Sequence, residues 1–281
     1  MPSEFSPSAR GPWGPLTVTV GAVAAGAVAA CGAAAAYLQQ RGIVSRQVPV
    51  HREYWARRTH EVRASAVPHA FHLVVVGDSA AQGVGVPDPE HGWVARVERR
   101  LAELLGRPVV TTNLSVSGAT TSDLIDDQLP LLEGLEREPD LVICEIGAND
   151  VARRQVALPG FTERVGAIAD ALPHGSVVAD VPSYGYGPHE MWVRRANTAI
   201  RETAEAHDLH VAPLHAATRP LWPRIVFTHM AQDLFHPNAA GYEVWADALW
   251  EGVAEALHDR GLVGADRLRH DAEERARALS A

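Results

Sequence analysis

The triplet Gly77-Asp78-Ser79 places a serine hydroxyl directly after the apolar run Phe71 to Val76. A strand that stops at glycine and then presents serine sets the hydroxyl at the carboxyl end of the strand. Open α/β sheets carry their chemistry at this edge. Serine alone is a weak nucleophile, so a catalytic role for Ser79 requires a base, an orienting acid and oxyanion donors from elsewhere in the chain.

His236 and Asp233 could supply the base and the acid. They stand three residues apart in the segment Asp233-Leu234-Phe235-His236-Pro237, so one turn of the backbone can bring their side chains together. His236 would take the proton from the Ser79 hydroxyl and pass it to the leaving group. Asp233 would hold the other ring nitrogen and so fix the tautomer. We therefore predict Ser79, Asp233 and His236 as catalytic residues.

Two further polar clusters could supply the oxyanion hole. They are Ser115-Val116-Ser117-Gly118-Ala119-Thr120 and Gly147-Ala148-Asn149-Asp150, and each follows an apolar, β-branched run. The candidate donors are the backbone N–H groups of Ser79 and Gly118 and the side-chain amide of Asn149. Because the carboxyl ends of parallel strands meet at one edge, we expect these groups to converge there.

The elements that must position these residues alternate along the chain. We expect strands at 71–76, 109–114, 140–146, 176–181 and 209–213, and helices at 92–105, 120–134, 160–171, 188–207 and 239–258. Short β-branched runs between longer amphipathic stretches are typical of βαβ units and a parallel sheet. The run 141–146 is apolar at nearly every position, which favours a central strand covered on both faces.

The four clusters, in this order, resemble the blocks of the SGNH hydrolase superfamily, also called the GDSL esterase/lipase family. Ser79, Gly118, Asn149 and His236 match the four residues that give the superfamily its name, and Asp233 matches its acid. The resemblance covers roughly residues 70–258. It implies an α/β fold, namely a flavodoxin-like three-layer α/β/α sandwich with a parallel five-stranded sheet.

The same resemblance implies a metal-independent serine hydrolase without a cofactor, which cleaves carboxylic esters through an acyl-enzyme intermediate. Two alternatives remain open: a thioesterase or lysophospholipase acting on lipid at a membrane, and a catalytically idle module that binds acyl ligands. Taken singly, Ser79 could cap a helix and Gly118 could be a turn glycine. Every catalytic position is filled, however, which favours the enzyme. Ala80, where the family name has leucine, lies at a position that varies within the family.

The substrate pocket can be placed only in outline. The loop 182–188 is rich in glycine and aromatic residues and should lie on the same edge as Ser79. Trp93 and Trp192 could line the opening. Arg153 and Arg154 follow Asn149 closely and could bind an anionic group of the substrate, although a solvated helix face is the simpler role for such a pair.

Composition narrows the class of protein. The chain has 281 residues, enough for one substantial core, and a formal net charge of −9, which argues against a basic nucleic-acid-binding face. Its two cysteines are Cys31, in an apolar N-terminal segment, and Cys144, in an expected strand. A disulfide between them is not expected.

The N-terminal region differs from the rest. Residues 16–38 contain no charged side chain, and a helix of this length could cross the roughly 30 Å hydrocarbon core of a bilayer. We therefore expect an N-terminal tail (1–15), a transmembrane anchor or signal-like segment (16–38), a basic and partly helical linker (39–68), the hydrolase domain (69–260) and a charged C-terminal tail (261–281). A cleaved signal peptide and a lipoprotein signal at Cys31 are the alternatives.

Arginines are concentrated after the apolar segment. Six of them lie between residues 41 and 63, against Arg10 alone before the segment. The positive-inside rule then favours a single-pass protein whose hydrolase domain faces the cytoplasm, with a secreted or outward-facing domain as the alternative. The expected partners are a small-molecule or lipid ester and the membrane.

Overall fold

A computed structural model describes residues 42–64, 69–153 and 157–279. Its centre is a sheet of five parallel strands in the order β2-β1-β3-β4-β5, which is the order of flavodoxin-like folds. The strands are β1 (Phe71–Gly77), β2 (Val109–Asn113), β3 (Leu141–Glu145), β4 (Val177–Ala179) and β5 (His210–Ala212). The prediction of five parallel strands is confirmed, and each strand ends within two residues of its expected bounds.

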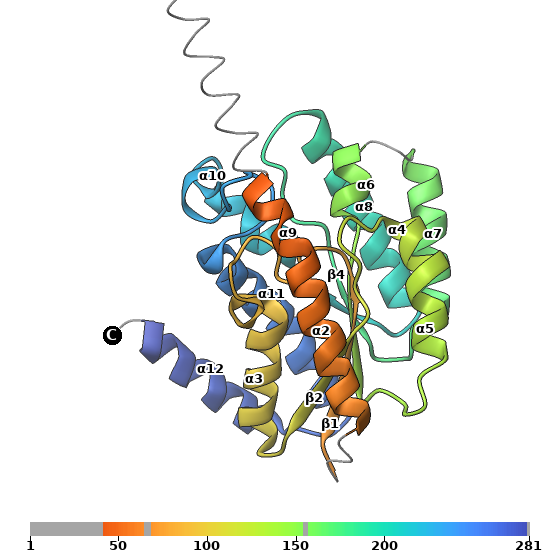
Figure 1. Cartoon of the computed structure of the whole chain (residues 1–281), viewed down its shortest axis with the longest axis vertical. Helices are drawn as coiled ribbons and strands as arrows, with labels where there is room; N and C mark the ends of the chain where they lie inside the picture. Colours follow the sequence, from red (N-terminus) through yellow and green to blue (C-terminus); the bar gives the residue numbers. More distant parts are fainter. Residues whose placement is uncertain (1–41, 65–68, 154–156, 280–281) are drawn as a thin grey trace, which may run out of the picture.

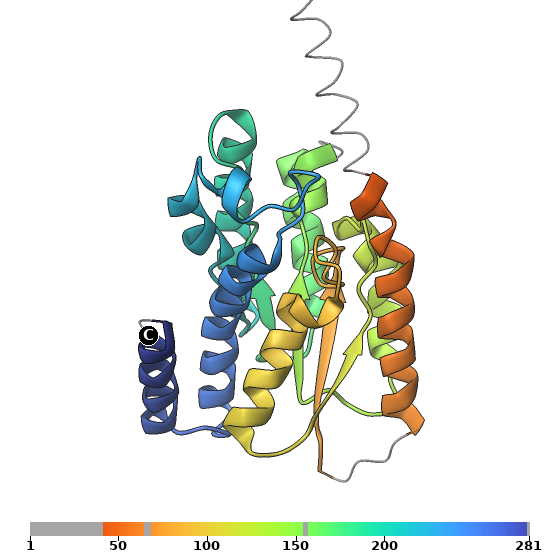
Figure 2. The same cartoon turned by 60° about the vertical axis from the view of Figure 1, so that its left-hand side comes forward.

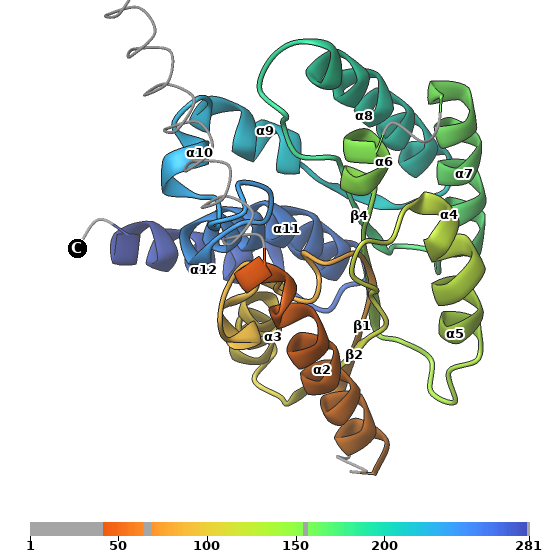
Figure 3. The same cartoon turned by 45° about the horizontal axis from the view of Figure 1, so that its top comes forward.

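Helices cover both faces of the sheet, because side chains alternate between the faces along each strand. Phe71, Leu73 and Val75 of β1 pack into the core beneath one helical layer, and Val74 and Val76 pack beneath the other. The first layer contains α2 (Gln47–Ala64), α3 (Trp93–Leu105) and α11 (Ala239–Asp259), and the second contains α5 (Leu129–Glu133), α7 (Leu158–Ala171) and α8 (Pro188–Ala206). Figures 1 and 3 show the sheet between these two layers.

Shorter elements carry the loops at the carboxyl edge of the sheet. They are η1 (Pro89–His91), α4 (Thr121–Asp123), the π-helical turn η2 (Leu124–Gln128), α6 (Ala148–Arg153), α9 (Leu214–Thr218), η3 (Arg219–Leu221) and α10 (Ile225–Thr228). The single helix expected at 120–134 is therefore divided into α4, η2 and α5. Pro130 has no N–H to donate to a carbonyl one turn earlier, and the wider turn of η2 lies immediately before it.

The segment expected to be a basic linker is largely part of the folded domain. Gln47–Ala64 forms α2, which packs beside β2. Trp55 is buried and donates a hydrogen bond to the carbonyl oxygen of Gln82. Arg58 forms ion pairs with Glu90 and Glu98. These partners lie more than 25 residues away, so tertiary contacts and not local periodicity fix this helix.

The sequence predicts further segments on either side of the hydrolase domain. At the C-terminus, α12 (Ala265–Leu279) lies along the outer side of α11 (Figure 2), with Arg275 over the ring of Trp250. The expected tail (1–15) and apolar segment (16–38) lie outside the described residues. Within the described part of the chain, no helix is both long and apolar enough to span a bilayer.

Candidate active site

Three side chains form a continuous hydrogen-bonded line at the carboxyl edge of the sheet. Nε2 of His236 lies 2.9 Å from Oγ of Ser79, and Nδ1 of His236 lies 2.6 Å from Oδ2 of Asp233. When Nδ1 carries the ring proton and donates it to Asp233, Nε2 can accept the hydroxyl proton of Ser79. The structure thus brings together the three residues that the sequence singled out as nucleophile, base and acid.

A tight turn positions Asp233 against His236. Oδ1 of Asp233 accepts hydrogen bonds from the backbone N–H groups of Phe235 and His236, each at 3.1 Å. Leu234, which directly follows Asp233, has a left-handed backbone with φ of 56°. Burial tends to raise the pKa of Asp233, but the hydrogen bonds from His236 and Phe235 outweigh burial, so this pKa is lowered. The carboxylate is therefore charged at neutral pH and able to hold the imidazole.

The turn that carries Ser79 is fixed from the sheet below. A Cβ atom at Gly77 would lie 2.3 Å from the carbonyl oxygen of Glu145, so only glycine allows β1 to approach β3 this closely. The side-chain amide of Gln128 bonds both backbone groups of Gly77, each at 2.8 Å. The carbonyl oxygen of Ser79 accepts a hydrogen bond from the N–H of Val84 at 3.0 Å. The candidate nucleophile Ser79 thus lies on a turn that is held by hydrogen bonds on both sides.

The two backbone donors expected for the oxyanion hole are at the same edge. Within the described residues, neither the N–H of Ser79 nor that of Gly118 donates a hydrogen bond. Gly118 has φ of 83°, and Nη2 of Arg153 lies only 2.9 Å from the place that a Cβ atom there would occupy. Both N–H groups are therefore available to donate hydrogen bonds to an anionic oxygen.

The amide of Asn149 also lies at this edge, but its hydrogens are engaged. Nδ2 donates to Oδ2 of Asp78 at 2.9 Å and to the carbonyl oxygen of Ala119 at 3.0 Å. An oxyanion would have to share or replace one of these acceptors. The role of Asn149 as third donor stays a prediction, and Asp78 emerges as the residue that holds this amide.

Three buried carboxyl groups lie beneath these donors. Burial, with repulsion from Asp150, raises the pKa of Asp78 to about 6. The hydrogen bonds from the backbone of Ala80 and the side chain of Asn149, and the charge of His236, act in the opposite direction. Burial, with repulsion from Asp78, raises the pKa of Glu145 well above its ordinary value. Burial likewise raises the pKa of Asp150, against the opposing hydrogen bonds from Thr121. The ionised forms of these three carboxyl groups are thus disfavoured by their burial and by their mutual repulsion.

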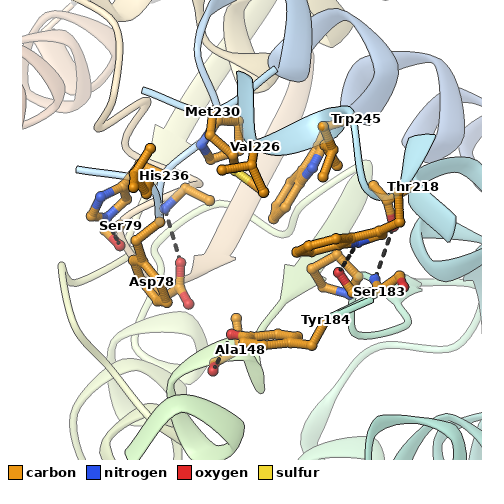
Figure 4. Close-up of a pocket in the computed structure, with 17 residues that line it drawn as sticks. Asp78, Ser79, Ala148, Ser183, Tyr184, Thr218, Val226, Met230, His236 and Trp245 are labelled. Atoms are coloured by element: carbon orange, nitrogen blue, oxygen red, sulfur yellow. Dashed lines mark hydrogen bonds between the residues drawn. The ribbon is translucent and has the colours of Figure 1, made fainter. Parts of the chain in front are cut away.

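An apolar pocket of about 120 Å³ opens beside the Ser79 hydroxyl. Figure 4 shows Ser79 and His236 at one end and Trp245 and Ser183 toward the other. Three other residues that line the pocket, Asp78, Ala80 and Ala148, lie beside Ser79. The rest come from the loop after β4 and from the chain between the end of α9 and the start of α11: Pro182, Tyr184, Thr218, Trp222, Ile225, Val226, Met230, Leu234, Phe235 and Pro237.

The aromatic loop expected at the pocket contributes as the sequence indicated. The hydroxyl of Tyr184 donates to the carbonyl oxygen of Ala148 at 2.8 Å, and Nε1 of Trp222 donates to the carbonyl oxygen of Ser183 at 3.0 Å. The buried carboxylate of Glu190 accepts hydrogen bonds from the N–H of Tyr184 and the hydroxyl of Ser183, both at 3.0 Å. The pocket wall is therefore tied to α6 and α8.

The two tryptophans predicted to line the opening lie elsewhere. Trp93 is fully buried in the core beneath α3, because its ring fills the space against the sheet. Trp192 packs edge-to-face on Phe161, 4.9 Å between ring centroids, and does not line this pocket. Arg153 lies beside Gly118, as noted above, and Arg154 lies outside the described residues.

Sequence reasoning missed several residues that support the site. Nε2 of Gln82 donates to the carbonyl oxygen of Ser115 at 2.7 Å, and its Oε1 accepts from the hydroxyl of Ser117 at 2.6 Å. Gln82 thus links the nucleophile turn to the loop of Gly118. Its position three residues after Ser79 could have indicated a role near the site, but no local pattern identifies its partners. Gln128 lies inside the helix expected at 120–134, where nothing in the sequence distinguishes it from a solvent-facing residue.

Sequence comparison identifies relatives with a related hydrolase domain. Residues 75–244 match the sequence model of the GDSL-like lipase/acylhydrolase family. A GDSL-like esterase of Mycobacterium tuberculosis is 28% identical over 212 residues, which cover 69% of this chain and 65% of that protein. The chain therefore spans slightly less than two thirds of that relative. An arylesterase of Vibrio mimicus is 29% identical over 174 residues, covering 59% of this chain and 80% of that protein.

Solved structures share the fold. The crystal structure of TesA superposes with a TM-score of 0.55 at 25% identity, covering 66% of this chain and 99% of that one. An acetylxylan esterase from Geobacillus stearothermophilus gives a TM-score of 0.53 at 20% identity, covering 67% of this chain and 96% of that one. At 20% identity, the second likeness concerns the fold alone.

Proposed function

The chain belongs to the GDSL-like lipase/acylhydrolase family, and from this premise we propose that it hydrolyses carboxylic esters with Ser79, His236 and Asp233 as its catalytic residues. The observation that carries the proposal is the unbroken line from Oγ of Ser79 through His236 to Asp233, next to an apolar pocket. The esterase and arylesterase names of the two relatives support the same reaction class.

Acylation begins at Ser79. As Oγ attacks the ester carbon, its proton moves to Nε2 of His236, and Asp233 stabilises the imidazolium that forms. The carbonyl oxygen becomes an oxyanion, which the N–H groups of Ser79 and Gly118 and the amide of Asn149 would bind. Collapse of this intermediate breaks the bond to the alcohol, and Nε2 returns the proton to the departing oxygen. The acyl group stays on Ser79.

Deacylation reverses these roles. A water molecule takes the position of the departed alcohol beside His236, gives its proton to Nε2 and attacks the acyl carbon. The resulting intermediate releases the carboxylic acid, and the proton returns to Oγ of Ser79. Because the alcohol side must admit water while the acyl group is still bound, we assign the apolar pocket to the acyl chain.

The size of the pocket supports a short acyl group as the part that is enclosed. It measures about 120 Å³, and an apolar cavity of about 150 Å³ is enough for benzene. We therefore propose that acyl groups of a few carbons fit inside, while longer chains must extend past the mouth formed by Leu234 and Phe235. The substrate class is thus a small ester or a lipid ester of which only part is enclosed.

We propose further that residues 16–38 hold the enzyme at a membrane as a single span. The support is their freedom from charge and their length, and the arginines that follow favour a cytoplasmic hydrolase domain. Membrane fractionation of the full chain tests the attachment: extraction by sodium carbonate without detergent would contradict it. A C-terminal reporter that is active only outside the cytoplasm would contradict the orientation.

The catalytic proposal is tested by Ser79→Ala in the full chain. Hydrolysis of p-nitrophenyl acetate and butyrate should fall by about 10³-fold or more, and labelling by a fluorophosphonate probe should disappear. Ser45→Ala, at an exposed position on the first described helical turn, serves as the matched control and should keep both properties. Activity in the Ser79 variant, or an inert wild type, would remove the catalytic assignment.

A further inference from the structure

Three large apolar side chains stand exposed around the mouth of the pocket. Phe227 is 88% exposed, Leu234 53% and Phe235 39%. Leu234 and Phe235 also line the pocket, and Phe227 follows the lining residue Val226 in α10. We call these three residues the apolar rim. Clustered exposed apolar side chains of this kind mark interaction surfaces more often than isolated ones do.

The described chain begins directly beside this rim. Val44 is 4% exposed and packs in one cluster with Val84 and Ala231, three residues before Leu234. The start of α2 and α10 accordingly lie at the same end of the molecule in Figure 1. The uncharged segment 16–38 ends six residues before Val44, and six extended residues reach at most about 20 Å. If the segment 16–38 spans a bilayer as proposed, the surface of that bilayer therefore lies within reach of the rim.

The exposed charges nearest the rim are mainly positive. The stretches 42–52 and 219–238 contain four arginines (Arg46, Arg52, Arg219 and Arg224) and a single carboxylate, Asp233. Arg219 is paired with the carboxylate of Glu190. Asp233 is buried against His236 and does not face outward. Arg46 and Arg224 are exposed. An apolar rim bordered by exposed cations matches the chemistry of an anionic lipid surface, where apolar side chains enter the interface and arginines meet the head groups.

We propose that the apolar rim docks on an anionic phospholipid bilayer, so that the active-site pocket opens toward the lipid. This inference rests on the proposed ester hydrolase with its 16–38 membrane segment, and it specifies the substrate as an ester dissolved in the bilayer. An acyl chain could then pass from the lipid to Ser79 between Leu234 and Phe235 without crossing water. Docking also explains why large apolar side chains are tolerated on the surface at this place.

A fluorescent label tests the contact independently of catalysis. The full chain carries Phe227→Cys together with Cys31→Ser, so the buried Cys144 is the one other cysteine. The cysteine at position 227 is labelled with the fluorophore NBD, and the protein is reconstituted in phosphatidylcholine/phosphatidylglycerol vesicles. Doxyl-labelled lipids should quench this label and aqueous iodide should not. Leu131→Cys is the matched control and should show the reverse pattern, because Leu131 is 55% exposed on α5, which lies on the opposite side of the molecule from α10 in Figure 1.

The other outcomes overturn either the docking proposal or the esterase proposal, and the label and the activity distinguish the two. Equal iodide quenching at positions 227 and 131, or failure of the chain to float with the vesicles, removes the lipid contact. Shielding of the label at 227 without vesicles would indicate a protein occupant, such as a second copy or residues 1–41. A wild type that is inert while the label reports lipid contact would remove the esterase proposal and leave the docking surface.

Kinetics supply the functional arm. Phe227→Asp should lower hydrolysis of a long-chain ester embedded in these vesicles by about tenfold, the value expected for losing one buried aromatic contact, and should leave soluble p-nitrophenyl acetate hydrolysis unchanged. Leu131→Asp should alter neither rate. An equal loss on both substrates, or no loss on the embedded ester, contradicts an active site that opens to the bilayer.

Discussion

Nδ2 of Asn149 lies 2.9 Å from Oδ2 of Asp78, so the residue next to Ser79 holds the amide that we predict as an oxyanion donor. The other hydrogen of this amide is bound by the carbonyl oxygen of Ala119 at 3.0 Å. Asp78 in turn accepts the N–H of Ala80 at 2.9 Å through its other oxygen. The nucleophile turn and the oxyanion donor are thus connected through one carboxylate.

This connection predicts coupling between the two residues. Asn149→Ala should lower kcat/KM for p-nitrophenyl acetate by about 10²–10³-fold, as loss of an oxyanion donor does. Asp78→Asn places an amide N–H₂ group against Asn149 and should cost about 10²-fold, mainly in kcat, because the donor is misdirected. The double variant should be hardly slower than Asn149→Ala, since both changes remove one function.

Asp88→Asn is the control for this cycle, because Asp88 caps the exposed turn η1 and asparagine caps equally well. Its kinetics should match the wild type. Losses from Asp78→Asn and Asn149→Ala that multiply in the double variant would show that Asp78 acts independently of Asn149.

The raised pKa of Asp78 predicts a pH-dependent stability. The carboxyl ionises near its ordinary value of 3.8 in the unfolded chain but at about 6 in the fold. Between these values only the unfolded chain releases the proton, so the free energy of unfolding should fall as pH rises from about 4 to 6 and then level off. The difference in pKa corresponds to about 3 kcal/mol.

Asp78→Asn removes this titration. Relative to the wild type, the variant should gain stability by about 2 kcal/mol between pH 4.5 and pH 7.5, as measured by urea unfolding of the full chain in detergent. Asp88→Asn again provides the comparison. If the stability difference between wild type and Asp78→Asn were the same at both pH values, the carboxyl of Asp78 would titrate normally in the folded protein.

The site could be placed from sequence because each polar cluster directly follows a strand. Once the five strands are parallel, Ser79, Gly118 and Asn149 must share one edge, and the short spacing of Asp233 and His236 allows one turn to pair them. The pocket could not be derived in the same way. About half of its lining residues lie between 218 and 237, where very short helices leave no periodicity from which their positions could be predicted.

The prediction of a basic, partly helical linker at 39–68 did not include the packing of α2 against the rest of the domain. Apart from His51 and Trp55, α2 exposes most of its described side chains and is rich in arginine, so its sequence resembles a solvated connector. The contacts that hold it involve Gln82, Glu90 and Glu98, which are 27 to 40 residues away. Contacts between residues this far apart in the sequence cannot be predicted from the pattern of residues 47–64 alone.

The packing of α2 predicts that Trp55 is a structural residue of the hydrolase domain. Trp55→Ala should lower the free energy of unfolding by about 3–5 kcal/mol, because a fully buried aromatic ring and a hydrogen bond to Gln82 are lost. Arg52→Ala, on the exposed side of the same helix, should change stability by less than about 0.5 kcal/mol. Urea unfolding monitored by circular dichroism distinguishes them. Equal, small effects of the two substitutions would restore the linker interpretation.

The size of the pocket predicts acyl-chain preference. Met230 and Val226 both line the wall opposite Tyr184 (Figure 4) and lie outside the hydrogen-bonded line of catalytic residues. Met230→Ala should raise the ratio of kcat/KM for p-nitrophenyl octanoate to that for the acetate by about tenfold, and Val226→Phe should lower the ratio by a similar factor. One methylene in an apolar pocket is worth about 10–200-fold in discrimination. Because both esters share one leaving group, only the acyl side is compared. A ratio that neither substitution moves would place the alcohol, and not the acyl chain, in this pocket.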